Sequence, residues 1–205
     1  MIKAYYIGGS PCSGKSTIAE MLVENYGFQY YKLDDHLDEY LKKGATDGYN
    51  LYKKVTSMTL DEIWLRRPLE QSDEEIAIYE IMFSYAMNDI SNLSGGAAVI
   101  AEGAGFLPNL MKKVNIDKSH YICIVPTKDF QISQYSQRAW VKDYLSSCTD
   151  IDSAFSNWME RDSIFAERVL KDAVELDYFS IEVDGTQSVN NNYSIVESVF
   201  KLRTK

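Results

Sequence analysis

The chain is poor in cysteine, in proline and in positive charge. Its 205 residues include 3 cysteines and 4 prolines, and 21 lysines and arginines stand against 30 aspartates and glutamates. Cys12, Cys123 and Cys148 are odd in number and widely spaced, which argues against a disulfide framework and favours a reducing compartment. The net charge of −9 repels phosphate backbones and anionic lipids, so we expect neither nucleic acid nor a membrane as a partner.

Long apolar runs, internal repeats and linkers are also missing. No stretch approaches the roughly 18 consecutive apolar residues of a membrane-spanning helix, and residues 1–10 lack the layout of a signal peptide. Apolar residues make up 45% of the chain and charged residues 25%, which is typical of a globular domain. We therefore expect a single domain over residues 1–205, located in the cytoplasm.

Short apolar runs alternate with longer helical patterns along the chain. The runs predict five strands, over residues 2–7, 28–33, 97–101, 121–125 and 179–183. Strands that alternate with helices indicate βαβ units, and hence a parallel sheet with helices on both faces. The sequence therefore predicts an α/β domain.

Helix boundaries are indicated at several points. Thr59 and Glu62 have the spacing of a capping box, which predicts a helix N-terminus, and Pro68 is expected to end that helix. Two later helices are expected over residues 129–146 and 154–176, with a polar stretch between them.

The segment from Gly9 to Ser16 matches the phosphate-binding pattern G-x-x-x-x-G-K-[ST] in full. It follows a predicted strand and opens an amphipathic helix, as phosphate binding at a helix N-terminus requires. Lys15 is expected to contact the β- and γ-phosphates of a nucleotide, and the Ser16 hydroxyl is expected to bind Mg²⁺. The predicted nucleotide-binding residues are consecutive: Gly9, Ser10, Pro11, Cys12, Ser13, Gly14, Lys15, Ser16 and Thr17.

Cys12 lies inside this loop, beside Lys15 and a helix N-terminus. Both would lower the pKa of its thiol, so either an oxidisable thiol or a small residue that fills the loop fits the sequence.

Together with its flanking strands, the loop resembles the P-loop kinases of small molecules, such as adenylate, shikimate and nucleoside kinases and chloramphenicol phosphotransferase. The resemblance implies a three-layer P-loop fold with five parallel strands in the order 2-3-1-4-5. It implies a helical acceptor-binding region after the second strand, here residues 35–95. A lid follows the fourth strand, here about 138–161, with the lid itself near 146–153. ATP and Mg²⁺ are the implied cofactors, and the implied partner is a small-molecule acceptor.

Carboxylates follow the second and third predicted strands. By similarity to phosphotransferases with an aspartate in this place, Asp34 is the first choice for the base that accepts or orients the proton of the acceptor hydroxyl. Asp35 is the alternative base, and otherwise a helix N-cap. Glu102, followed by Gly103, resembles the Glu-Gly of uridine-kinase-like proteins and is expected to hold Mg²⁺ through water or to bind the acceptor with Gly103. An ion pair with Lys15 is the structural alternative for Glu102.

Arginines and one loop complete the predicted site. Arg138 and Arg161, and to a lesser degree Arg168, resemble the lid arginines with which adenylate kinases clamp adenine and phosphates. Exposed ion pairs are the alternative for arginines on helices. The Asp-Gly-Thr sequence that includes Gly185 and Thr186 resembles the adenine-edge loop of adenylate kinases, although it is also a common turn.

Two functions compete at this point. The first is ATP-dependent transfer of the γ-phosphate to a hydroxyl or phosphate of a small molecule: a nucleotide, nucleoside, sugar, acid or antibiotic. The second is a nucleotide-binding regulator or NTPase that acts on a protein partner. That function calls for a Walker B aspartate after an aliphatic strand, and the third strand ends in Glu102 instead, which favours the kinase.

Overall fold

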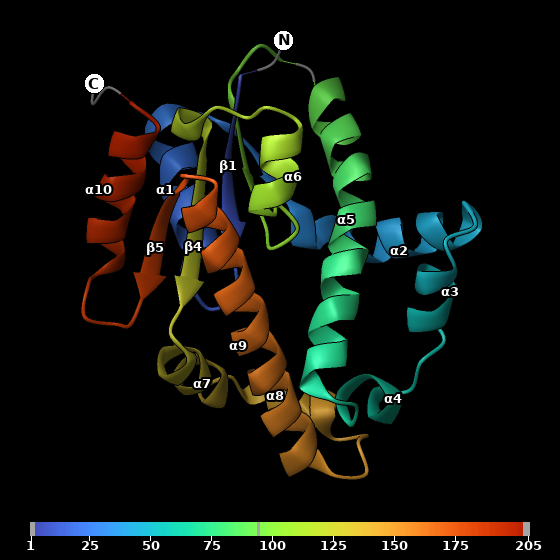
Figure 1. The fold of residues 1–205 in the computed structure, drawn as a ribbon. Coiled ribbons are helices and arrows are strands. Elements are labelled where there is room, and N and C mark those ends of the chain that lie inside the picture. The colour runs from blue at the N-terminus through green and yellow to red at the C-terminus, as the bar shows by residue number, and fades with distance from the viewer. Residues whose placement is uncertain (1–2, 94, 203–205) are drawn as a thin grey trace.

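The computed structural model describes residues 3–93 and 95–202, and its centre is a five-stranded parallel sheet (Figure 1). The strand order is β2-β3-β1-β4-β5. The strands are β1 (Ala4–Gly9), β2 (Gln29–Lys32), β3 (Val99–Glu102), β4 (Tyr121–Pro126) and β5 (Phe179–Val183). All four neighbouring pairs are parallel. The predicted strand count, direction and order are confirmed, with strand ends displaced by up to two residues.

Helices join and follow these strands along the chain. The helices are α1 (Lys15–Tyr26), α2 (Leu37–Thr46), α3 (Asn50–Val55), α4 (Leu60–Trp64), α5 (Pro68–Asn92), α6 (Pro108–Lys113), α7 (Lys128–Ser136), α8 (Ala139–Leu145), α9 (Ile151–Glu175) and α10 (Val189–Val199), with short 3₁₀ helices η1 (Leu33–His36) and η2 (Lys118–His120). Among the described residues, no helix is both long and apolar enough to cross a membrane.

The sheet is buried on both faces, which gives three layers. Successive side chains of β1 point to opposite faces. Tyr5 and Ile7 join the core formed with α1 and α10, while Tyr6 joins the core formed with α5, α6 and α9. A strand covered on both sides needs apolar residues at every position, and this explains why the strands read as continuous apolar runs.

A third apolar cluster lies beyond the carboxyl edge of the sheet. The long helices α5 and α9 extend past the strands, where α4, α7 and α8 gather around them (Figure 1). Trp64 of α4 and Trp158 of α9 stack there with ring centroids 4.5 Å apart. This cluster supports the loops that follow the strands, and it therefore positions the site described below.

Two predicted helix boundaries were wrong, whereas the capping box was confirmed. Thr59 accepts the N–H of Glu62 and the Glu62 side chain accepts the N–H of Thr59. The helix that they start ends at Trp64, and Pro68 opens α5, where an N–H would have no partner within the helix. The helix predicted over 129–146 is two helices, because Arg138 has extended backbone so that α8 can pack into the third cluster.

Gly9 offers a test of how closely the phosphate loop is packed. Its φ is +122°, and an added Cβ would lie 1.9 Å from the carbonyl oxygen of Ile124; Gly27, with φ +68° after α1, has nothing within 4 Å of its Cβ position. We expect Gly27→Ala to lower the free energy of unfolding by about 1–2 kcal/mol through backbone strain alone. Gly9→Ala adds overpacking and should cost about 2–5 kcal/mol in total. Urea unfolding followed by circular dichroism measures both, and equal losses would contradict the close approach of β1 and β4.

Candidate active site

The loop between β1 and α1 is closed by its own hydrogen bonds. The Ser10 N–H donates to the Ile124 carbonyl oxygen at 3.2 Å, and the Ser13 hydroxyl donates to the Ser10 carbonyl oxygen at 2.9 Å. Lys15 Nζ donates to the same Ser10 oxygen at 2.6 Å and to Ser13 Oγ at 3.4 Å, and the residue is 7% exposed. The ammonium of Lys15 is therefore held inside the curve of the loop.

The N-terminus of α1 opens onto the same loop. Its N-cap is Gly14, which has φ +81° and provides no side-chain cap. The first N–H groups of a helix carry partial positive charge and need acceptors. Together with Lys15, they form an arrangement that attracts phosphate groups.

Cys12 occupies a turn of the loop with φ +63°. Burial raises the pKa of its thiol, and this effect outweighs the opposite effects of Arg138 and Lys15. The predicted lowering of this pKa is wrong because the side chain packs against the third apolar cluster. Its surroundings therefore support a packing role for this residue.

Glu102 ends β3 beside the loop and is 1% exposed. Its Oε1 accepts hydrogen bonds from Ser16 Oγ and from the Tyr30 hydroxyl, each at 3.0 Å. These two groups, rather than Lys15, are the partners that the buried carboxylate requires. Burial, and next the charge of Glu102, raise the pKa of Tyr30, so this phenol stays a donor. Tyr30 was missed in the sequence because nothing local links it to a residue 72 positions away.

A cavity of about 260 Å³ brings together residues from several predicted parts of the site. It is lined by loop residues 11–17 and by Asp34, Tyr79, Glu102, Ala104 and Arg138. Asp34 reaches it from η1, and Arg138 from the N-cap of α8. A phosphate-binding loop, two carboxylates and an arginine thus face one space.

Asp35 and the other predicted residues lie outside this cavity. Asp35 is exposed and 4.0 Å from Lys32 Nζ, and the N-caps of η1 and α2 are Lys32 and His36, so its predicted capping role is wrong. Gly103 has φ +153°, and an added Cβ would lie 2.5 Å from Leu33 Cβ. Arg168 forms an exposed ion pair with Asp73.

The loop after β5 forms a compact turn. The Thr186 N–H donates to Asp184 Oδ1 at 2.9 Å, and Gly185 has φ +87°. Neither Gly185 nor Thr186 lines the 260 Å³ cavity. Their loop follows the carboxyl end of β5, which pairs with β4 in the same sheet.

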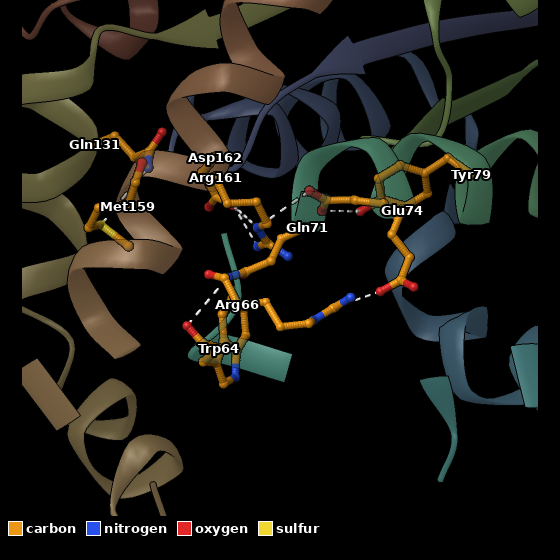
Figure 2. A network of polar contacts seen from close by, with 10 residues as sticks. Trp64, Arg66, Gln71, Glu74, Tyr79, Gln131, Met159, Arg161 and Asp162 are labelled. Atoms are coloured by element: carbon orange, nitrogen blue, oxygen red, sulfur yellow. Dashed lines mark hydrogen bonds and ion pairs between the residues drawn. The ribbon is translucent and has the colours of Figure 1, made fainter. Parts of the chain in front are cut away.

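Arg161 lies in a buried ionic network. Its Nη2 is 2.5 Å from Asp162 Oδ1, its Nε is 3.4 Å from Glu75 Oε2, and its guanidinium lies 4.8 Å from the Trp64 ring centroid. Burial raises the pKa of Glu75 to about 7, although Arg161 acts in the opposite direction. Figure 2 shows Arg161 directed toward Asp162, with Tyr79 on the opposite side of the network.

A second cavity, of about 230 Å³, lies in the predicted acceptor region. It is lined by residues of α2, α3, α4, α5 and α9, and Tyr79 is shared with the first cavity. Arg66 donates to Glu74 across it at 2.6 Å (Figure 2). Sequence reasoning missed Glu75 and Tyr79 because the acidic run and the aromatic residues of this region give no direction for their side chains.

The residues at Ser16 and Glu102 fit a magnesium ion in chemistry and number. Both provide oxygen atoms, and Mg²⁺ in such sites takes its remaining ligands from water and phosphate. Within residues 3–93 and 95–202 there is no cluster of three or more His, Cys, Asp or Glu side chains suited to a metal.

Solved structures share this fold across almost the whole chain. Shikimate kinase from Bacteroides thetaiotaomicron is 11% identical, with 98% of this chain and 100% of that chain covered and a TM-score of 0.51. TT1252 from Thermus thermophilus is 13% identical, with 98% and 99% covered and a TM-score of 0.50. Shikimate kinase from Acinetobacter baumannii, solved with shikimate, is 13% identical, with 100% and 97% covered and a TM-score of 0.49. No protein-family model and no curated protein matches the sequence.

At sequence identities of 11–13%, the similarity to these structures shows the fold alone. That fold is the one of the small-molecule P-loop kinases, as the resemblance of the loop implied.

The hydrogen bond from Tyr30 to Glu102 gives a test of the buried carboxylate. We expect Tyr30→Phe to lower the free energy of unfolding by about 1.5–3 kcal/mol, the range for hydrogen bonds to charged groups. Tyr26→Phe is the matched control, because Glu197, to which Tyr26 donates, also keeps a second donor (Tyr193) but is less buried than Glu102. That control should cost under about 1 kcal/mol. Thermal unfolding followed by circular dichroism measures both, and a larger loss in Tyr26→Phe would contradict the role given to Glu102.

Proposed function

We propose that this protein is an ATP-dependent phosphotransferase that moves the γ-phosphate to a hydroxyl or phosphate of a small-molecule acceptor. The observation that carries the proposal is that the two cavities share a lining residue, Tyr79. One cavity contains the phosphate-binding loop, and the other, between α2 and α9, can enclose an acceptor. A nucleotide-binding regulator that acts on a protein partner has no need of the second cavity.

The proposed roles follow from the placement of the residues in the first cavity. Lys15 and the N-terminus of α1 bind the β- and γ-phosphates, and Arg138 stabilises the charge that spreads over the transferring group. Ser16 would hold Mg²⁺ directly and Glu102 would hold it through water, and the ion would supply neutralisation of phosphate charge. Asp34 accepts or orients the proton of the acceptor hydroxyl.

Three predicted residues take supporting roles in this proposal. Arg161 is held by Glu75 and Asp162 beside Tyr79, which supports a place on the acceptor side rather than on the phosphates. Gly185 and Thr186 contact the base of the nucleotide, because their loop follows β5 at the sheet edge where P-loop ligands bind.

The activity is tested by phosphate transfer from radiolabelled ATP to a library of small metabolites. We expect turnover that depends on the acceptor, together with slow background hydrolysis. Hydrolysis that is fast without any acceptor would favour the NTPase instead.

Lys15→Ala tests the phosphate-binding loop. The variant removes a charge-assisted contact worth about 1.5–3 kcal/mol, so ATP affinity should fall roughly 10- to 150-fold while the fold is kept. Lys171→Ala is the matched control, because Lys171 is exposed on α9 and pairs only weakly with Glu175 at 3.8 Å. Calorimetry of ATP binding that shows equal affinities for the two variants would rule out the role of Lys15.

Asp34→Asn tests the proposed base and separates chemistry from binding. Asparagine keeps the shape and removes the basicity, so kcat should fall by about 10² to 10⁴ while ATP affinity stays near that of the parent. Asp35→Asn is the neighbouring control, and it should keep near-parent turnover because Asp35 is exposed beside Lys32. The opposite pattern, with Asp35→Asn slow and Asp34→Asn active, would assign the base to Asp35.

A further inference from the structure

The charges in the second cavity are already matched within the protein. Among the described residues that line it, the cations are Arg66 and Arg161 and the carboxylates are Glu74 and Glu75. Above the pKa of about 7 that burial gives Glu75, two positive and two negative groups give a formal charge of zero. The cavity thus has no net positive charge to offer an anionic acceptor.

The Arg66–Glu74 ion pair is short, and Lys54, which does not line the cavity, also pairs with Glu74. Arg66 Nη2 lies 2.6 Å from Glu74 Oε2, and Lys54 Nζ lies 2.5 Å from Glu74 Oε1. Burial acts to raise the pKa of Glu74, but the hydrogen bonds from Arg66 and Lys54 outweigh it and hold that pKa below its ordinary value. Glu74 is therefore ionised at neutral pH and neutralises Arg66.

The positive charge of Arg161 is opposed by two carboxylates. It pairs with Glu75 and also with Asp162, which is 1% exposed and sits behind it on α9. An anionic acceptor would have to displace one of these carboxylates or lose its hydration without a free counter-charge, and both are costly in a buried site.

The cavity does offer hydrogen-bonding atoms and apolar walls. Within the described part of the chain, Gln71 Oε1 and Arg66 Nε are buried and have no hydrogen-bond partner, whereas Glu75 Oε2 accepts no hydrogen bond but lies 3.4 Å from Arg161 Nε. The free oxygen calls for a donor and the nitrogen for an acceptor, a set that hydroxyl and amide groups satisfy. The remaining walls are largely apolar and come from Leu37, Leu41, Val55, Met58, Ile63 and Ile78.

We infer that the acceptor is an uncharged, hydroxyl-bearing molecule with an apolar face, and that the Arg66–Glu74 and Arg161–Glu75 pairs select against carboxylates and phosphate esters. This inference rests on the proposed phosphotransferase function and narrows its acceptor to an alcohol. Arg66, Glu74, Arg161 and Glu75 are specificity residues in this account, and Asp34 remains the residue at the reacting hydroxyl.

The test uses a library of hydroxylated carboxylic acids, each paired with its primary amide, for example hydroxymethylbenzoate with hydroxymethylbenzamide. Binding to the full chain is measured at pH 8 by calorimetry in the presence of Mg²⁺ and an ATP analogue that cannot transfer its phosphate. We expect the amide of a pair to bind at least about tenfold more tightly than the acid, which corresponds to about 1.4 kcal/mol. Acids that bind as tightly as their amides, or a library without any amide that binds, would overturn the inference.

Glu74→Gln tests which residues produce the selection. The substitution leaves Arg66 without its carboxylate, so the preference for the amide should shrink by about tenfold or reverse. Glu70→Gln is the matched control on the same helix, because Glu70 is exposed and its 3.7 Å pair with Arg67 lies outside the cavity. A preference that Glu74→Gln leaves unchanged would overturn the role of this pair.

A double variant guards against misfolding of Glu74→Gln. Arg66→Met combined with Glu74→Gln removes both charges and leaves no unpaired arginine. Lys54 also loses Glu74, but it is 55% exposed and does not line the cavity, so the preference should return to that of the parent. A double variant that binds acids better than the parent would contradict the charge argument.

Phosphate transfer from ATP to the same pairs distinguishes this inference from the proposed function. Amides that bind but are never phosphorylated would contradict the phosphotransferase and leave the ligand class standing. Phosphorylation of acids in preference to amides would confirm the phosphotransferase and overturn the ligand class.

Discussion

The buried carboxylate of Glu102 joins three parts of the molecule at one point. It belongs to the end of β3, and it accepts hydrogen bonds from Ser16 at the start of α1 and from Tyr30 in β2. A charge removed from water needs such partners, so the order of the strands and the position of the phosphate loop depend on one another. A movement of the loop would therefore take the Ser16 donor away from this buried carboxylate.

The helices outside the sheet form the second cavity, on the other side of Tyr79 from the phosphate loop. Because α5 and α9 continue past the strands, they carry Glu75 and Arg161 to a place where the shared residue Tyr79 faces both cavities. The stack of Trp64 on Trp158 fixes α4 against α9 at the far end. The first cavity thus rests on β1 and α1, whereas the second cavity rests on helix packing.

Features encoded within a short stretch of sequence were predictable, and those that depend on tertiary packing were not. The phosphate loop, the strands and the Thr59 capping box follow from local patterns. By contrast, the break at Arg138 has no local signal, because Val141 and Leu145 draw α8 into the third cluster. The ion pair of Glu75 with Arg161 joins residues of α5 and α9, so only the packed structure reveals that both arginines that line the second cavity, Arg66 and Arg161, are paired with carboxylates.

All three tryptophans lie in one end of the molecule. The ring centroids of Trp64 and Trp140 are 4.5 Å and 6.0 Å from that of Trp158, and this cluster stands beyond the sheet edge. Fluorescence excited selectively in tryptophan, and not in the 15 tyrosines, therefore reports on the helical end and not on the strands. A spectroscopic transition seen through tryptophan describes the undocking of α4, α8 and α9, and its agreement with a backbone signal would show that this end and the sheet melt as one cooperative unit.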